Sequence, residues 1–526
     1  MISYEAMRSG SIDFLLAVTF GGQVFRWASR PATYTDADGN QLEHQGGVDT
    51  SIDFAFELLS PSPALISVPF SLVFPVSVAK MVASGFDFSA ATGEFSIIET
   101  GASYESRIVL LRGAVVAPSY GVDGSPTSFS VRQNNYEDMV SIPGATARVT
   151  DETWDDYDDS VKGRFYPIVF GRPGVITDGS SEEQTTGSPG LLVDLTNRYL
   201  LVCDGRVASG NVHVIDLNGN AGDGSGESFS VTTTKDNNGR TVSVVQLRST
   251  ATGSAQVAAV EGHEYWVRWD EDGGIFASDS TAVMLGAGEL IRYMSNLSSI
   301  QFDRGAIASV RPKLNEYRIS GYIDEPTTPW GFIQDNLLPI LPVSFIATGG
   351  GLTPIVFDRN SPAVAHLVDS PDISFSPAVD YDNGEIVNSI RIDYGTRGDS
   401  QELRSTFTIS GDDREPGAHR SLIANTSQKR YGKREVTIQT AYVDDKATAQ
   451  LIALDRLALY GLQRRRITAN ASWSHAYLKR GMCVTVTVES LYISAQKAVV
   501  ESVSYSISGI SLILLIVEDP ARDTRA

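Results

Sequence analysis

The last third of the chain decides the fold, and its ordered segments are NSIRIDYG (388–395), YGKREVTIQTAYVDD (431–445), KATAQLIALDRLALYGL (446–462), RRRITANAS (464–472) and YLKRGMCVTVT (477–487). The third segment has apolar residues at helical spacing, whereas the others have the alternation and β-branched residues of strands. This order predicts a small β-barrel or sandwich with one helix laid across it. Nothing in the stretch resembles a catalytic centre.

The sequence predicts that helix 446–462 begins after an aspartate N-cap, either Asp444 or Asp445. It also predicts that small and apolar residues on one stripe pack on a sheet. The stripe consists of Ala447, Leu451, Leu454 and Ala458.

The opposite face of this helix carries Leu457 and Tyr460, which are more apolar than a free surface favours. Arg464, Arg465 and Arg466 follow where the helix ends, and cations there complement the helix dipole. For Leu457 and Tyr460, a subunit contact and a second core layer both remain open. For the three arginines, the alternative to the helix dipole and interface ion pairs is nucleic-acid binding. We predict that all five residues form part of a subunit contact.

Composition favours a large acidic protein built from strands and turns. Its 526 residues fit about three or four domains at roughly 100–200 residues each. The 47 glycines and the abundant Val, Ser, Thr, Tyr and Phe favour strands joined by turns. A net charge of −21 argues against binding nucleic acid over a broad surface. The charge fits either simple solubility or an acidic passage through which nucleic acid slides without sticking.

We therefore predict a mainly β, multidomain chain with α+β elements. The hairpin signal IDFLLAVTF-GG-QVFRWA opens an N-terminal β domain, and the acidic segment 151–163 closes it as a solvated linker without calcium-loop spacing. The predicted domains are an N-terminal β domain (1–162), an inserted β-rich module (163–280), an α+β connecting domain (281–372) and a C-terminal β domain (373–526).

The sequence offers no catalytic, cofactor or metal motif. Cys203 and Cys483 lie far apart, which favours two buried thiols over a disulfide or a zinc site. The six histidines are scattered, and neither a nucleophile elbow nor a distinguishable carboxylate pair is present. No signal sequence and no apolar run of about 18 residues is seen, so we expect synthesis in a cytoplasm and no membrane span.

The C-terminal order resembles that of hub proteins from the tails of long-tailed bacteriophages and gene transfer agents. The turn L-x-x-G-x-x-V-x-V-T is present at Leu478, Gly481, Val484, Val486 and Thr487. Arg480 stands where such proteins often carry proline. The segments KGRFYPIVFGRPG, LLPILPVSFIATGGGLTPIVFD and IDFLLAVTFGGQVFRWAS are similar to the middle and the first domain of these hubs.

The resemblance implies two tail-tube-like β-barrel or sandwich domains, 1–162 and 373–526, each flanked by a helix. A homotrimer would then present six such domains and adapt sixfold to threefold symmetry. The ring would cap a hexameric distal tail protein or tail tube ring and meet a tail fibre or tip protein on its other side. Its channel would pass the tape measure protein and then DNA, without specific binding. The resemblance implies a non-enzymatic virion protein at the tail tip or baseplate.

The alternative is a carbohydrate-binding or carbohydrate-active β protein involved in host surface recognition. Trp266, Trp269 and the Tyr-rich strands could stack on sugar rings. The missing signal sequence and the missing acid pair count against it. Mass in solution separates the two, because a hub is a trimer.

Overall fold

The chain is mainly β, and its strands form several sheets in the computed structural model. This confirms the predicted fold class. The structure describes residues 12–49, 52–54, 67–72, 82–83, 85–87, 90–119, 127–132, 138–179, 181–207, 210–219, 226–250, 256–269, 284–348, 351–357, 361–382, 386–411, 417–506 and 509–517.

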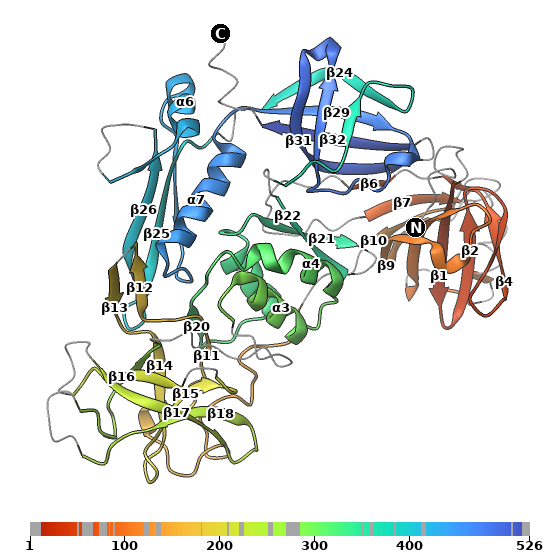
Figure 1. The fold of residues 1–526 in the computed structure, drawn as a ribbon. Helices are drawn as coiled ribbons and strands as arrows, with labels where there is room; N and C mark the ends of the chain where they lie inside the picture. Colours follow the sequence, from red (N-terminus) through yellow and green to blue (C-terminus); the bar gives the residue numbers. More distant parts are fainter. Residues whose placement is uncertain are drawn as a thin grey trace.

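Figure 1 shows how the parts lie around a central group of helices. The N-terminal sheet (red to orange) lies beside the C-terminal sheet (dark blue), although they are at opposite ends of the sequence. A second blue and cyan unit of strands and helices lies on the other side, and a yellow barrel lies below it. The chain thus runs out from one pair of sheets, through the middle parts, and back.

The N-terminal sheet has the strand order β3-β4-β2-β1-β8-β9-β10-β7-β5. The predicted hairpin is confirmed, since Phe20 pairs with Gln23 and the turn glycines Gly21 and Gly22 have φ of 56° and 82°. The strands are β1 (Ile12–Phe20), β2 (Gln23–Ala28), β3 (Ala32–Thr35), β4 (Gln41–Gly46), β5 (Val48–Asp49), β7 (Ser67–Leu72), β8 (Thr92–Glu99), β9 (Ile108–Ser119) and β10 (Thr127–Arg132).

The C-terminal sheet has the order β23-β30-β31-β32-β29-β24 and takes one further strand from the N-terminal part of the chain. That strand pairs Phe54 with Val503 of β31. The strands are β6 (Ile52–Phe54), β23 (His366–Val368), β24 (Ile373–Asp382), β29 (Arg464–Ala471), β30 (Cys483–Val488), β31 (Ile493–Ser506) and β32 (Gly509–Val517).

These two sheets share one hydrophobic core. Phe14 and Phe95 come from the N-terminal sheet, and Trp473 comes from the segment after β29. The ring centroids of Phe14 and Trp473 are 5.8 Å apart at 63°, an edge-to-face contact. Because burial of each such side chain contributes roughly 1.5–3 kcal/mol, the two sheets stabilise each other.

Residues 188–268 contain a closed barrel of order β14-β15-β18-β17-β16-β19. Successive residues of its first strand face opposite ways, with Leu192 in the main core of the molecule and Leu191 in a smaller core. The strands are β14 (Ser188–Asp194), β15 (Tyr199–Asp204), β16 (Asn211–Asp216), β17 (Glu227–Lys235), β18 (Thr241–Gln246) and β19 (Tyr265–Arg268).

The acidic segment 151–163 packs on this barrel, so the prediction of a solvated linker is wrong. Trp154 and Val161 are buried in the smaller core, and Trp154 Nε1 donates to the hydroxyl of Tyr166 at 3.0 Å. The exposed residues of the segment are mostly carboxylates. Because these carboxylates dominate the composition, the sequence did not show that Trp154 and Val161 are buried.

Helices α3 and α4 pack together at the centre of the molecule. Both helices lie in the segment predicted as an α+β connecting domain, and α4 contains Pro312 in its last turn. Asp303 caps α4 by accepting from Ala306 N at 2.9 Å. The central elements are β11 (Ile168–Phe170), β12 (Val175–Asp178), β13 (Ser181–Gln184), α3 (Ala287–Leu297), α4 (Arg304–Leu314), β20 (Gly321–Ile323), α5 (Pro329–Phe332), a π-helix (Ile333–Leu337), β21 (Val343–Thr348) and β22 (Gly351–Val356).

A four-stranded sheet of order β27-β26-β25-β28 lies in the segment expected as the C-terminal domain, separate from the C-terminal sheet. The expected helix is present as α7, the longest helix in the described part of the chain. Its N-cap is Asp445, which accepts from Thr448 N at 2.9 Å. The elements are β25 (Ser389–Arg397), β26 (Glu402–Ser410), β27 (His419–Arg420), α6 (Leu422–Tyr431), β28 (Glu435–Gln439) and α7 (Lys446–Tyr460).

Helix α7 mainly covers β25 and β26, and only its C-terminal end, at Leu459, packs against the C-terminal sheet, which differs from the expected placement. The apolar face of these strands, which includes Ile390 and Ile409, requires such a cover. The predicted packing stripe is only partly buried: Leu451 and Leu454 pack against the edge of the main core, whereas Ala447 is exposed. The buried side chains of α7 include Ile452 and Leu457. Apolar residues surround most of this helix, so spacing alone did not identify the buried face.

Candidate functional site

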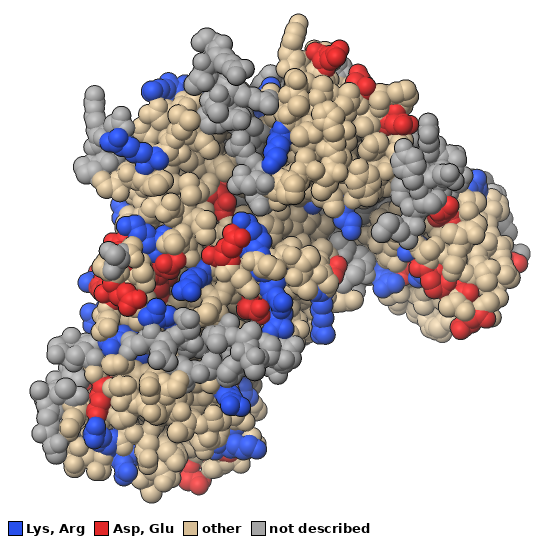
Figure 2. Space-filling view, in the orientation of Figure 1, with Lys and Arg blue, Asp and Glu red and all other residues tan. Residues whose placement is uncertain are grey.

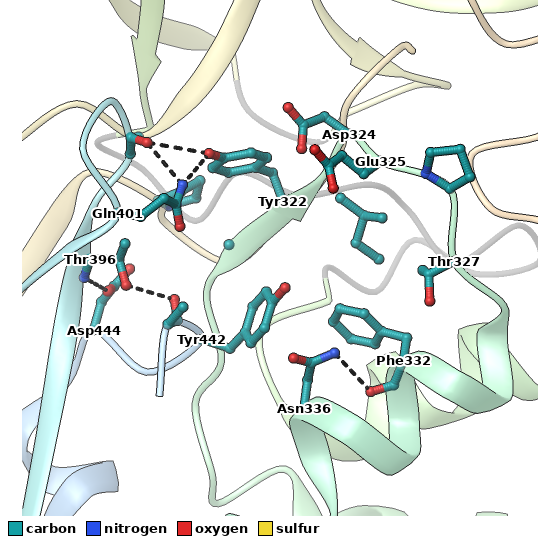
Figure 3. A pocket seen from close by; sticks show the side chains of 17 residues that line it. Tyr322, Asp324, Glu325, Thr327, Phe332, Asn336, Thr396, Gln401, Tyr442 and Asp444 are labelled. Atoms are coloured by element: carbon teal, nitrogen blue, oxygen red, sulfur yellow. Dashed lines mark hydrogen bonds between the residues drawn. The ribbon is translucent and has the colours of Figure 1, made fainter. Parts of the chain in front are cut away.

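A pocket of about 460 Å³ lies where three parts of the chain meet. They are the segment before the barrel (Pro173 and Gly187, the barrel entry), the central segment 321–336, and the four-stranded sheet with the turn before α7. Figure 3 shows its labelled side chains, which come from three separate parts of the chain. They are Tyr322, Asp324, Glu325, Thr327, Phe332 and Asn336 of the central segment, Thr396 and Gln401 beside the end of β25, and Tyr442 and Asp444 before α7. Hereafter we name it the junction pocket.

Hydrogen bonds fix the walls of the junction pocket. Gln401 Nε2 donates to the hydroxyl of Tyr322 at 2.6 Å and to the carbonyl of Gly398 at 2.9 Å (Figure 3). Thr396 N donates to Asp444 Oδ1 at 3.3 Å. These bonds join the turn after β25 to both other walls.

Two glycines permit the close approach of these walls. A Cβ at Gly321, whose φ is 155°, would lie 2.7 Å from the ring of Tyr442. A Cβ at Gly398 would lie 2.0 Å from the carbonyl oxygen of Gly187. A side chain at either position would push the walls apart.

The junction pocket is acidic. The described residues that line it include the carboxylates of Asp324, Glu325 and Asp444, and none of them is Lys, Arg or His. Burial raises the pKa of Asp324 despite the opposing field of Arg164. Burial also raises the pKa of Asp444 to about 7 and that of Tyr442 to about 12.

The backbone explains why Asp444 cannot turn toward water. Its carbonyl accepts from Thr177 N of β12 at 2.7 Å, and the neighbouring Val443 carbonyl accepts from Gly395 N at 2.8 Å. The residue is therefore held between β12 and β25, and its side chain is 8% exposed.

Charged pairs tie the β12–β13 hairpin to the four-stranded unit. Lys446 Nζ lies 2.7 Å from Asp178 Oδ1, and Arg404 Nε lies 3.2 Å from Glu183 Oε1. Figure 2 shows acidic and basic side chains side by side in this region. Such exposed pairs contribute little individually, so they fix orientation more than stability.

The five residues expected at a subunit contact do not form one surface cluster. Leu457 is 1% exposed and lies in the main core. Tyr460 and Arg464 are brought together, with the guanidinium 4.7 Å from the ring centroid. Arg465 Nη2 donates to Gln496 Oε1 at 2.6 Å.

Arg466, the last of the five, makes a bidentate pair with Glu501, with distances of 2.8 and 3.0 Å. Its partner Glu501 is 5% exposed on the neighbouring strand β31. The contacts of these residues within the chain therefore match the core-and-ion-pair interpretation, and the side chain of Leu457 is not available to a partner.

The tryptophans named for sugar stacking are buried. Trp266 is 7% exposed and Trp269 is fully buried, with its Nε1 donating to Ser188 Oγ at 2.9 Å. Trp266 packs edge-on against Tyr322, with ring centroids 6.2 Å apart. Neither ring offers an open face, so this support for the carbohydrate alternative is removed.

The sequence contains a signal for the junction pocket that our sequence analysis missed. The tripeptide Tyr-apolar-Asp occurs in YID (322–324) and in YVD (442–444). Both copies converge on the pocket, and both follow a small residue, Gly321 or Ala441. No spacing rule connects the two copies, because they are about 120 positions apart.

Within the described ranges, no group of three or more His, Cys, Asp or Glu could hold a metal ion. Both cysteines are buried thiols, as predicted. Of the helices in the described ranges, none is long and apolar enough to cross a membrane.

No protein-family model matches the sequence. No curated protein matches it either. Solved structures with a similar arrangement include the tail protein from Neisseria meningitidis MC58, at 12% identity over 96% of this chain and 97% of that chain, with a TM-score of 0.38. The 43 kDa tail protein of prophage MuSo2 from Shewanella oneidensis is 9% identical over 97% and 99% of the two chains, with a TM-score of 0.33. The prophage tail protein gp18 from Listeria monocytogenes EGD-e is 9% identical over 96% and 94%, with a TM-score of 0.35. Each of these three solved structures is described as a tail protein, and two of them are from prophages.

Proposed function

We propose that this chain is a structural protein of a phage-like tail, and that it forms the trimeric hub at the distal end of the tail. The observation that carries the proposal is the pairing of the N-terminal and C-terminal sheets around one core. One chain thereby holds two β units side by side. Three chains then supply six β units, which is the number needed to meet a hexameric ring.

In this proposal the hub caps a hexameric distal tail protein or tail tube ring and adapts sixfold to threefold symmetry. Its channel passes the tape measure protein and then DNA, which slides through without specific binding. A tail fibre or tip protein binds the other side. The chain is made in the host cytoplasm, acts in the virion at the tail tip or baseplate, and has a structural rather than a catalytic role.

We keep a subunit contact in the proposal but limit it to Tyr460 and Arg465. Tyr460 and Arg465 are half-buried in the single chain, so a neighbouring subunit can still reach them. Leu457 instead holds α7 on its own sheet. Aromatic residues and arginine are enriched at interfaces, which supports the narrower choice.

Light scattering coupled to size exclusion tests the oligomeric state. Three chains of 56.7 kDa give about 170 kDa. A mass near this value across a tenfold dilution supports the hub. A stable monomer under the same conditions would count against it.

A further inference from the structure

We propose that the junction pocket binds an organic cation, a guanidinium or alkylammonium group, supplied by a free polyamine or by a basic side chain of a partner protein. This inference goes beyond the structural role proposed above and does not depend on it. It assigns a ligand class to the pocket where three parts of the chain meet.

The arrangement of charge points to a cation. Asp324 and Glu325 follow β20 on one side of the pocket, and Asp444 lies on the other, with Tyr322 and Tyr442 between them (Figure 3). The described lining contains no Lys, Arg or His, and Arg164 acts on Asp324 only from outside the lining. Because Asp324 is partly withdrawn from water, its attraction for a cation is stronger than that of an exposed carboxylate.

The aromatic walls select an organic cation. Tyr322 and Tyr442 line the pocket as half-buried rings, whereas Phe332 is buried and supports Tyr442 edge to face, with ring centroids 5.1 Å apart. An ammonium or guanidinium group placed over such rings gains from their quadrupoles as well as from the carboxylates. A volume of about 460 Å³ accommodates such a group with its alkyl chain.

A metal ion and a neutral sugar fit the pocket less well. Calcium and magnesium take six or more oxygen ligands, whereas no group of three potential ligands gathers anywhere in the described ranges. A neutral sugar would bring no positive charge to the carboxylates of Asp324 and Glu325. An organic cation would pair with the carboxylates and also contact the aromatic rings.

A bound cation would also connect the parts of the chain that form the walls. Gly187 lies at the barrel entry, Asp324 in the central segment and Asp444 before α7. A ligand that binds only the assembled walls stabilises that assembly by mass action. The junction would therefore melt at a higher temperature with the ligand than without it.

The test is calorimetric titration of the full-length protein with three probes. Spermidine represents a free polyamine, N-acetylarginine methylamide represents a partner's side chain, and N-acetylcitrulline methylamide is the neutral match of the second. The test variant is Asp324→Asn with Glu325→Gln, which removes two charges and keeps the side-chain shapes. The matched control is Asp335→Asn, an exposed acid nearby that does not line the pocket.

We expect at least one cationic probe to bind the wild-type protein with a Kd of about 1 mM or tighter, and the double variant to weaken it about tenfold or more. We expect the Asp335→Asn variant to bind as the wild type does. Tighter binding of spermidine indicates a free polyamine, and tighter binding of the arginine probe indicates a partner's side chain. The proposal is overturned if neither cation binds at about 10 mM, if citrulline binds as well as arginine, or if a folded double variant binds like the wild type.

Discussion

Replacing Asp444 by asparagine should remove a pH dependence of stability that the junction imposes. Burial raises the pKa of this carboxyl from its ordinary 3.8 to about 7 in the folded chain. The folded state therefore holds the proton more tightly than the unfolded chain does. The free energy of unfolding falls as pH rises between these two values, and the stabilising contribution is lost above about pH 7.

The size of the effect follows from the shift of about three units, which corresponds to roughly 4 kcal/mol between acid and alkaline solution. Asparagine resembles the protonated acid in shape and cannot ionise. The Asp444→Asn variant should therefore match the wild type near pH 4 and exceed it by up to roughly 4 kcal/mol near pH 8.

Hydrogen exchange measured by mass spectrometry, on peptides that cover β28 and the start of α7, reports the local free energy of opening. The control is Asp445→Asn, which keeps the N-cap of α7 because asparagine caps as well as aspartate. Equal protection of the wild type and Asp444→Asn at both ends of this pH range would refute the reasoning. So would the same gain in the Asp445→Asn control.

Three further predictions concern packing. Leu457→Asp should unfold α7 and the four-stranded sheet by placing a charge in the core, whereas Tyr460→Asp should leave the chain folded. Circular dichroism and urea melts measure this, and equal tolerance of both changes would place Leu457 outside the core. Phe95→Ala should lower the free energy of unfolding by about 3–5 kcal/mol and reduce the hydrogen-exchange protection of both the N-terminal and the C-terminal sheet. A loss of protection confined to the N-terminal sheet would contradict the shared core. Burial raises the pKa of the Cys203 thiol, so Cys203 and the buried Cys483 should resist thiol reagents until urea is added, and rapid modification of native protein would contradict this.

Local sequence signals predicted the elements whose pattern is self-contained. The hairpin of β1 and β2 follows from two alternating runs and a Gly-Gly turn, and α7 follows from its capping aspartate and apolar spacing. Helix α6 was missed, because its sequence LIANTSQKRY is polar and has only two buried residues. Its Ser421 cap is a weak signal without an apolar run behind it.

The pairing of distant parts could not be predicted from local patterns. The buried face of α7 depends on the sheet it covers, and that sheet forms from β25 to β28 rather than from β29 to β32. The junction pocket likewise depends on three segments that meet only in the folded chain. Sequence spacing carries no information on such contacts, which tertiary packing alone determines.

In the proposed hub, three chains bring their paired β units together around one axis. Electron cryo-microscopy of the purified protein, alone and with the hexameric tail ring that it is proposed to cap, would show this arrangement. We expect a threefold ring in which the N-terminal and C-terminal sheets of each chain alternate as six units around a central channel. A particle without threefold symmetry, or a ring built from only one of the two sheets of each chain, would contradict it.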